Sequence, residues 1–367
     1  MQISKLEART VEVPLARATR IATRVLPSRL YTWVRASAED GTQGVGFCLG
    51  GPAATEFVRG HLARGVQGRS VFETEAIWQE LYQEILLQGR RGAGLRALSA
   101  VDIALWDLKG KMLNQPVWAL IGRIRSRVPA YASGGYYVEG KTTNDLVAEV
   151  AGYVEAGFRA VKIKIGGVAL AQDLARVRAV RQAIGPEVLL MLDANNAWPN
   201  AHEAVAAIRR FETYAPDWIE EPLPPDDLVG LRRVAQSVQT PIATGEIEAT
   251  RWGFQALIDG GSVSVVQPDA AVVGGISEWL KIAHLASARS VPVAPHWLAD
   301  LHVQVAACAD NARWIEYFTS TDILNIGLLL RSHLRVEDGE ALLPSEPGLG
   351  IAVDDEALQR YATDAWA

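Results

Sequence analysis

Three short apolar segments that each end on a carboxylate restrict the fold of this chain more than any other feature. Residues 188–193 read Val-Leu-Leu-Met-Leu-Asp, which predicts a buried parallel strand ending at Asp193. Glu220 ends a second short segment 27 residues later, and Glu246 follows a third after another 26 residues. Each interval has the length of one strand–helix unit, and α/β barrels form their active sites at the C-terminal tips of their strands. The spacing therefore predicts three consecutive units that direct one carboxylate each to a shared point.

A metal ion is the expected partner of these carboxylates. Three close carboxylates repel one another unless a cation binds between them, and a site built only from oxygen ligands suits Mg²⁺. We therefore expect Asp193, Glu220 and Glu246 to bind Mg²⁺.

Short apolar strands recur beyond these three, from residue 129 to residue 317, at intervals of roughly 22 to 31 residues. Helical patterns separate them. The expected strand cores are residues 129–132, 160–165, 188–193, 218–220, 241–244, 263–267, 291–294 and 314–317. Eight strands in this alternation predict a closed parallel barrel, a (β/α)₇β-type TIM barrel, over residues 126–330.

The segment before the barrel has a different pattern. Residues 3–47 alternate apolar and polar side chains, which predicts a three-stranded antiparallel sheet, and residues 55–120 are helical in character. Together they suggest an α+β capping domain over residues 1–125. The tail, residues 331–367, is rich in turn residues, and we expect it to return to the capping domain.

A basic stretch lies between the first two expected strands. The segment Ala16–Arg29 carries Arg17, Arg20, Arg24 and Arg29 and is predicted to be a loop. A solvated basic loop is one interpretation. The other is a flap that clamps an anionic substrate, and on this reading Arg17, Arg20 and Arg24 bind the substrate.

Composition excludes several other classes of function. The chain has 36 Lys and Arg against 42 Asp and Glu, a net charge of −6, and these values argue against a nucleic-acid or anionic-membrane partner. Cys48 and Cys308 are its only cysteines, so we expect a reducing compartment rather than a disulfide framework. The N-terminus has no signal-peptide core, and no apolar run is long enough to span a membrane. These observations predict a cytoplasmic protein.

Two lysines are expected at the mouth of the barrel. In Val161-Lys162-Ile163-Lys164-Ile165 the alternation places both lysines on one face and the aliphatic residues on the other. Because the aliphatic residues suit the layer between barrel and helices, Lys162 and Lys164 should point inward. Two desolvated lysines are expected to lower each other's pKa, which would make one a usable base. A structural lysine paired with a buried acid is the alternative.

Two later strand tips supply a histidine and two more acids. Asp269 follows the sixth expected strand and His296 the seventh, so the carboxylate can hold one imidazole nitrogen and make the other a stronger base. Glu316 lies on the eighth strand, where it is either a functional group or an ordinary acid of the barrel layer.

In this order and spacing the pattern resembles the enolase superfamily, in particular its mandelate racemase subgroup. The resemblance runs over nearly the whole chain: the capping domain, Lys162-x-Lys164, the three carboxylates, and the pair Asp269 and His296. It implies that the three carboxylates are Mg²⁺ ligands and that Glu221 is an adjacent non-ligand. It also suggests an even-numbered homo-oligomer such as an octamer.

The resemblance further implies a role for each remaining site residue. Lys164 and the His296–Asp269 pair would act as acid/base groups on opposite faces of a small carboxylate substrate. Lys162 would polarise the substrate carboxylate, and Glu316 would hydrogen-bond it. The segments Ala16–Arg29 and Gly46–Pro52 would close over the pocket. Asn195 would support the metal site, and we expect both Asn195 and Trp297 to contact the substrate.

The expected chemistry is removal of a proton next to a carboxylate, which is favourable only if the developing negative charge is neutralised. We favour loss of water from an acid sugar, an aldarate such as galactarate or talarate or an aldonate, because the arginines suit a second carboxylate or many hydroxyls. The alternative within the same chemistry is a racemase or epimerase of a 2-substituted acid. A Schiff-base lyase using Lys164 and a catalytically silent barrel are further alternatives.

Overall fold

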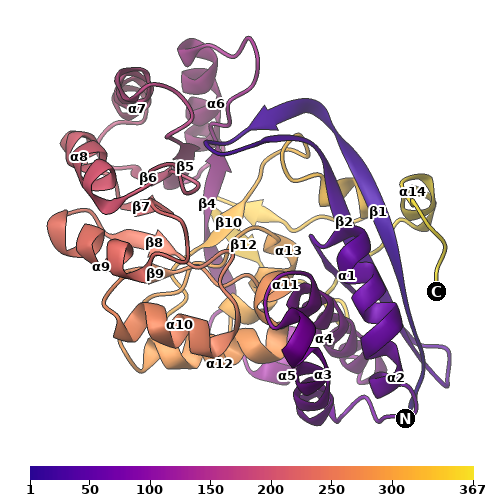
Figure 1. Ribbon diagram of the computed structural model, residues 1–367. Helices are drawn as coiled ribbons and strands as arrows, with labels where there is room; N and C mark the ends of the chain where they lie inside the picture. The colour runs from indigo at the N-terminus through magenta and orange to yellow at the C-terminus, as the bar shows by residue number, and fades with distance from the viewer.

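The computed structural model describes residues 1–367 as a capping domain packed against a barrel (Figure 1). The capping domain begins with three antiparallel strands in the order β1-β2-β3, as the alternation predicted. Their bounds are β1 Ile3–Arg20, β2 Val25–Ala38 and β3 Gln43–Cys48. The helices that follow are α1 Gly51–Phe57, the π-helical η1 Val58–Leu62, α2 Ala63–Val66, α3 Thr74–Gly89, α4 Ala93–Met112 and α5 Val117–Ile121.

The sheet lies directly on helix α4. A Cβ atom added at Gly46 would come within 2.0 Å of the backbone oxygen of Ala100, and one added at Gly44 within 2.3 Å of that of Ala104. Only glycine permits this contact between β3 and the α4 backbone. The segment Gly46–Pro52, which was expected to close over the pocket, begins in strand β3 and ends in the first turn of α1.

The predicted loop over Ala16–Arg29 is mostly strand, so this prediction is wrong in its secondary structure. β1 continues to Arg20 and β2 starts at Val25, which leaves a loop of only residues 21–24. The extended hairpin reaches the barrel, where the backbones of Arg20 and Tyr137 exchange hydrogen bonds of 2.8 and 3.1 Å. It forms an arm that ends near α6 and β5 (Figure 1).

The barrel has the parallel strands that the spacing predicted, with one exception. They are β4 Arg127–Gly134, β5 Ala160–Lys164, β6 Leu189–Asp193, β7 Trp218–Glu220, β8 Ile242–Thr244, β9 Val265–Val266 and β10 Ile315–Tyr317. β10 pairs in parallel with β4. The expected strand 291–294 is reduced to Val293, which bridges Val266 on one side and Ala312 on the other. This position completes the ring but is too short to count as a strand.

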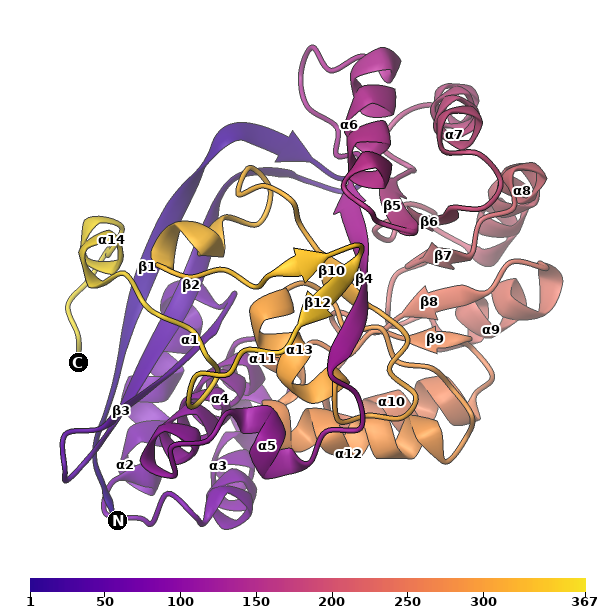
Figure 2. The ribbon, with the colours of Figure 1, turned by 180° about the vertical axis from the view of Figure 1, so that it is seen from behind.

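Helices surround the barrel on its outside (Figure 2). They are α6 Thr143–Glu155, α7 Leu170–Ile184, α8 Ala201–Phe211, η2 Glu212–Tyr214, α9 Leu228–Ser237, α10 Thr250–Asp259, α11 Ala270–Val273, α12 Ile276–Ser287 and α13 Ala299–Ala306. The short helix η3 Asn325–Leu329 instead lies against the β1–β2 hairpin, where Asn325 donates to the carbonyl of Val13 at 2.9 Å. A separate small core fills the barrel interior, with Tyr131 and Trp218 in edge-to-face contact at 5.6 Å. None of the helices combines the length and apolar character of a membrane span.

The tail contacts the barrel before it reaches the capping domain. It contains β11 Val336–Glu337, β12 Glu340–Leu342 and α14 Asp355–Arg360. β12 pairs antiparallel with barrel strand β4, so this part of the tail extends the barrel sheet. Farther on, Ala362 bridges Val11 of β1, and the Ala8 amide donates to the carbonyl of Ala367 at 2.9 Å.

Helix α4 of the capping domain also holds the turn between α11 and α12. Ser99 accepts a hydrogen bond from the amide of Gly274 at 2.9 Å. Asp102 accepts from the backbone and the hydroxyl of Ser277 at 2.9 and 2.7 Å. Because Asp269 is the N-cap of α11, these contacts fix the segment that carries a predicted site residue.

Candidate active site

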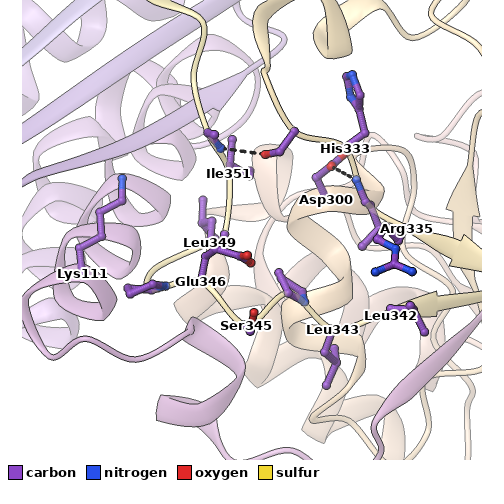
Figure 3. A pocket seen from close by; sticks show the side chains of 16 residues that line it. Lys111, Asp300, His333, Arg335, Leu342, Leu343, Ser345, Glu346, Leu349 and Ile351 are labelled. Atoms are coloured by element: carbon purple, nitrogen blue, oxygen red, sulfur yellow. Dashed lines mark hydrogen bonds between the residues drawn. The ribbon is translucent and has the colours of Figure 1, made fainter.

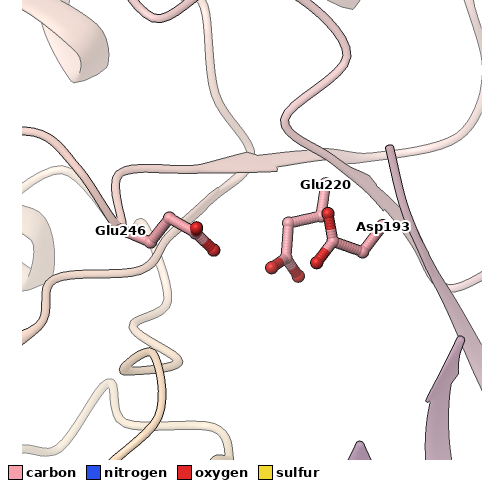
Figure 4. A group of neighbouring side chains, drawn as sticks. All are labelled: Asp193, Glu220 and Glu246. Carbon is pink, nitrogen blue, oxygen red and sulfur yellow. The ribbon is translucent and has the colours of Figure 1, made fainter. Parts of the chain in front are cut away.

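The three predicted metal ligands lie together at the mouth of the barrel. Asp193 ends β6, Glu220 ends β7, and Glu246 follows β8 by two residues. One oxygen atom from each lies within 4.8 Å of the other two. Figure 4 shows Glu246 extending toward the adjacent carboxylates of Asp193 and Glu220. Parallel pairing brings this about, because Asp193 and Glu220 are register partners on neighbouring strands.

The cluster has the properties of a site for a hard divalent cation. Oε2 of Glu246 is buried without a hydrogen-bond donor. Burial, together with the charges of Glu221, Asp193 and Glu220, raises the pKa of Glu246 well above its ordinary value. Protein groups thus leave this carboxylate uncompensated, and a divalent cation held by three carboxylate oxygens would compensate it.

The two lysines point into the same region, as predicted, but their pKa values move in the opposite direction from our prediction. Lys162 Nζ lies 2.7 Å from Glu220 and 2.9 Å from Glu316, and Lys164 forms an ion pair with Asp193. Burial lowers the pKa of Lys162, but Glu220 and Glu316 raise it by more, and the net pKa is well above the ordinary value. For Lys164, burial is likewise outweighed by Asp193, so its pKa is also raised. The prediction gave more weight to the second lysine than to its alternative, a lysine paired with a buried acid, and the structure shows such pairs for both lysines.

Asp269 and His296 form the predicted pair. His296 Nδ1 lies 3.0 Å from Asp269 Oδ2, and His296 Nε2 lies 3.4 Å from Glu246 Oε2. Since Asp269 accepts the Nδ1 proton in this arrangement, Nε2 faces the carboxylate cluster with its lone pair. Burial raises the pKa of Asp269, but hydrogen bonds from His296 and from the amide of Ala271 act against it, and the net pKa lies below its ordinary value.

Glu316 and Asn195 support the charged groups around them. Besides its ion pair with Lys162, Glu316 accepts a hydrogen bond from the amide of Trp297 at 2.8 Å. Burial raises the pKa of Glu316, but Lys162, His296 and Lys164 together lower it to about 2. The amide of Asn195 donates to Asp193 at 2.9 Å, and its side chain donates to the same carboxylate at 3.3 Å.

These groups surround a cavity of about 200 Å³ between the barrel mouth and the β1–β2 hairpin. Lys164, Asn195, Glu246, Asp269, His296 and Trp297 all line it. Apolar side chains complete the wall, with Ile21 and Leu26 from the hairpin, Leu49 from the segment after β3, and Leu298 from the barrel.

The arginines divide into two groups. Arg24 lines the cavity, whereas Arg17 and Arg20 do not. Arg17 is exposed and donates to the carbonyl of Glu139 at 2.8 Å, and the guanidinium of Arg20 lies 5.2 Å from the ring of Tyr137. The predicted substrate contact is therefore not supported for these two, because both have partners outside the cavity.

Two other arginines reach the cavity: Arg29, which belongs to the predicted basic segment but was not among the expected substrate contacts, and Arg96, which the sequence did not indicate. Arg29 is buried and stacks over the ring of Trp297 at 4.4 Å, and Arg96 of α4 donates to the carbonyl of Leu49 at 3.0 Å. Arg29 could have been found from the alternation of β2 once the strand was recognised. Arg96 has no local signal, since its position follows only from how α4 packs against the barrel.

Glu221, predicted as a non-ligand, is also buried and lines the cavity. Burial, followed by the charges of Asp193 and Glu220, raises its pKa to about 8. Its backbone has φ = 44°, a left-handed conformation that turns the chain directly after the strand tip.

A larger cavity, of about 780 Å³, lies away from the barrel mouth between the tail and α13 (Figure 3). Lys111, Asp300, His333 and Arg335 are among its lining residues. Its half-buried acid, Asp300, already accepts a hydrogen bond from the amide of Leu334 at 2.9 Å. Size alone therefore does not identify the active site, and the convergence of acid, base and cation-binding groups favours the smaller cavity.

Comparison with known families agrees with this geometry. A model described as the mandelate racemase / muconate lactonizing enzyme N-terminal domain matches residues 5–122, and an enolase C-terminal domain-like model matches residues 145–357. The chain belongs to the enolase superfamily. The resemblance inferred from the sequence is therefore confirmed.

Relatives within the superfamily cover most of the chain. An arabinonate dehydratase from Saccharolobus solfataricus is 35% identical over 294 residues, 78% of either chain. A D-galactarolactone cycloisomerase from Agrobacterium fabrum is 35% identical over 375 residues, which cover 98% of this chain and 99% of the relative.

A solved structure shows the same architecture. The L-talarate/galactarate dehydratase from Salmonella typhimurium LT2, liganded with Mg and L-lyxarohydroxamate, matches with a TM-score of 0.91 and 30% identity, over 100% of this chain and 94% of the relative. The Salmonella enzyme was crystallised with magnesium. In the present chain, Asp193, Glu220 and Glu246 offer a site for the same ion. Dehydratases and a cycloisomerase among the relatives identify the chain as an enzyme.

Proposed function

We propose that this enolase-superfamily enzyme removes the proton next to the carboxylate of an acid sugar and then eliminates water to give a 2-keto-3-deoxy acid. One observation carries the proposal. Lys164 and His296 line a single cavity together with Glu246 of the carboxylate triad. A substrate carboxylate bound at the triad would place its α-carbon within reach of both proton-transfer groups.

Asp193, Glu220 and Glu246 would hold the metal ion. Mg²⁺, when bound, supplies positive charge that stabilises the enediolate form of the substrate carboxylate. Lys162 contributes a second positive charge at the same place, because Glu220 and Glu316 keep it protonated between them. The walls of Ile21, Leu26 and Leu49 exclude water and strengthen these interactions.

His296 is the group suited to accept the α-proton. Its Nδ1 is held by Asp269, which leaves Nε2 with a lone pair on the cavity side. Lys164 is suited to the opposite task, because its ion pair with Asp193 favours the ammonium form. In the proposed elimination the α-proton moves to Nε2 of His296, and the β-hydroxyl leaves as water after it receives a proton from Lys164. The resulting enol then loses its hydroxyl proton and takes up a solvent proton at C3, which gives the 2-keto-3-deoxy acid.

The substrate class follows from the charge of the cavity wall. Arg24, Arg29 and Arg96 face the cavity from the hairpin and from α4. Guanidinium groups bind carboxylates and hydroxyls, so a substrate with a polar or anionic distal end fits this wall. We propose an aldarate, with galactarate and talarate as the first to test, or an aldonate.

The proposal is tested by following proton NMR spectra in D₂O with Mg²⁺ and a panel of mono- and dicarboxylic acid sugars. The expected result is loss of the α-signal and appearance of a new C3 methylene signal for at least one acid sugar. Exchange of the α-proton with change of configuration, and no loss of water, would show the alternative reaction instead.

That alternative is a racemase or epimerase, and the presence of two proton-transfer groups on one cavity favours it specifically. A product that retains its β-hydroxyl would indicate the racemase or epimerase, because dehydration removes this group as water. A Schiff-base lyase is disfavoured, because it needs a neutral lysine and Asp193 raises the pKa of Lys164. We also propose a homo-oligomer, which light scattering on the purified protein would test.

A further inference from the structure

A second histidine lies behind the Asp269–His296 pair. His302 belongs to α13 and is completely buried. Its Nδ1 lies 3.0 Å from the carbonyl oxygen of Trp297, and its Nε2 accepts a hydrogen bond from the amide of Ala270 at 3.0 Å. A carbonyl can only accept and an amide N–H can only donate, so the two contacts assign the neutral tautomer with the proton on Nδ1.

These two contacts join the two loops that carry the pair. Ala270 follows Asp269 at the start of α11, and Trp297 follows His296. One imidazole therefore binds the backbone next to each partner. Among the side chains around the Asp269–His296 pair, only His302 hydrogen-bonds to the backbone of both loops.

The loop after His296 has a conformation that needs such support. Trp297 has φ = 56° and Leu298 has φ = 34°, both in the left-handed region. Residues with a Cβ in this region cost on the order of 1 kcal/mol or more each. The amide of Trp297 is held by Glu316 at 2.8 Å, and its carbonyl is held by His302. The strained turn that orients His296 is thus fixed at both sides of one residue.

The neutral form of His302 also leaves the charge of Asp269 available to His296. His302 Nε2 lies 3.5 Å from Asp269 Oδ1, but an unprotonated nitrogen donates nothing to this oxygen. Asp269 instead accepts from the amide of Ala271 at 2.8 Å and from His296 at 3.0 Å. Burial lowers the pKa of His302, against the pull of Asp269, which agrees with the neutral form.

We propose that His302 is a positioning residue: it ties the Asp269 loop to the His296 loop and thereby aims Nε2 of His296 at the substrate. His302 does not touch the cavity wall and takes no part in proton transfer. The kinetic consequence rests on the proposed function, whereas the structural consequence can be measured without a substrate.

Three variants separate positioning from simple loss of stability. His302→Ala removes both contacts, His302→Asn can retain the donor to Trp297, and His302→Gln can retain the acceptor for Ala270. The matched control is Gln304→Ala. Gln304 is equally buried on α13, donates to the carbonyl of Leu349 at 2.7 Å and accepts from the amide of Trp118 at 2.9 Å, away from the pair.

We expect His302→Ala to lower kcat by about 100-fold, as a small misplacement of a catalytic group does. KM and the Kd for Mg²⁺ should stay within about twofold, because binding of the substrate carboxylate does not depend on His302. His302→Asn should recover part of kcat, since it can hold the strained turn. Gln304→Ala should leave kcat unchanged even if it lowers the melting temperature.

The readout without a substrate is the NMR spectrum of ¹⁵N-histidine-labelled protein. The signal of the His296 Nδ1 proton should move in His302→Ala and keep its wild-type position in Gln304→Ala. If this signal and kcat are both unchanged in a folded His302→Ala protein, the positioning role is wrong; a fall in kcat matched by an equal fall for Gln304→Ala would also overturn it. If the wild type converts no acid sugar, the proposed function fails on its own, and the NMR comparison still decides the role of His302.

Discussion

The two groups proposed to transfer protons, Lys164 and His296, differ in how the protein holds them. Lys164 is on a regular strand and forms an ion pair with Asp193, so its proton is retained. His296 is on an irregular segment, is held from behind by Asp269, and has no hydrogen-bond donor at Nε2. This difference is the reason for our proposal that Lys164 donates a proton and His296 accepts one. The following predictions test this division of roles.

Removal of the metal site should have the largest effect, because both groups depend on it. EDTA, or Glu246→Gln, is expected to lower α-proton exchange at least about 1,000-fold, as loss of several kcal/mol of charge stabilisation implies. The control is Glu248→Gln, since Glu248 is buried two residues away, pairs with Arg91 at 3.0 Å and does not line the cavity. Exchange that survives EDTA and Glu246→Gln would contradict the assignment of the triad.

Substitution of Lys164 and of His296, one at a time, should then separate the two roles. His296→Asn is expected to lower exchange of the α-proton with D₂O by about 10²- to 10⁴-fold, the usual contribution of a general base. Lys164→Ala should lower elimination of water by a similar factor while exchange continues. The measurement is proton NMR of one substrate with each variant. Continued exchange in His296→Asn and its loss in Lys164→Ala would reverse the assignment.

Arg24 is expected to bind the distal end of the substrate and so to determine which end lies between Lys164 and His296. Arg24→Leu is expected to lower kcat/KM for a dicarboxylate about 10- to 100-fold, with a smaller effect on a monocarboxylate, because a charge-assisted pair is lost. Arg17→Leu is the control from the same hairpin, since Arg17 lies outside the cavity. Equal losses for the two substrates would show that Arg24 does not read the distal carboxylate.

The pH dependence of metal binding should be no larger than the effect of the arginine. Burial and neighbouring acids raise the pKa of Glu221 to about 8 and that of Glu246 well above its ordinary value. Groups with a raised pKa keep their protons below it, so Mg²⁺ must displace them, and its affinity should fall by up to about tenfold per pH unit from pH 8 to pH 6. Calorimetry in two buffers with different ionisation enthalpies would detect the released protons. Affinity that is independent of pH would mean that the carboxylates are already ionised without the metal.

Most of the site could be predicted from the sequence because its residues sit at strand tips. In a parallel barrel the tips of successive strands converge, so the spacing of Asp193, Glu220 and Glu246 was enough to bring them together. The inward direction of Lys162 and Lys164 followed from strand alternation in the same way. Periodicity and spacing are local quantities that a sequence contains directly.

The errors arose where the outcome depends on distant partners. Arg17 and Arg20 share a hairpin with Arg24 in the sequence, yet Glu139 and Tyr137 hold them away from the cavity. The pKa values of the lysines were predicted with the wrong sign because the carboxylates that face them come from other strands.

The sequence alone determined the type of fold and which carboxylates, lysines and histidine meet at the barrel mouth, because strand period and unit length set these. The family followed from the resemblance that these residues show in their order. Only the tertiary structure decided which arginines face the cavity and that His302 stands behind the Asp269–His296 pair. It also decided that Lys164 forms an ion pair with Asp193 while Nε2 of His296 faces Glu246. These properties depend on packing between segments far apart in the chain, and the free energies of such contacts leave no periodic trace in the sequence.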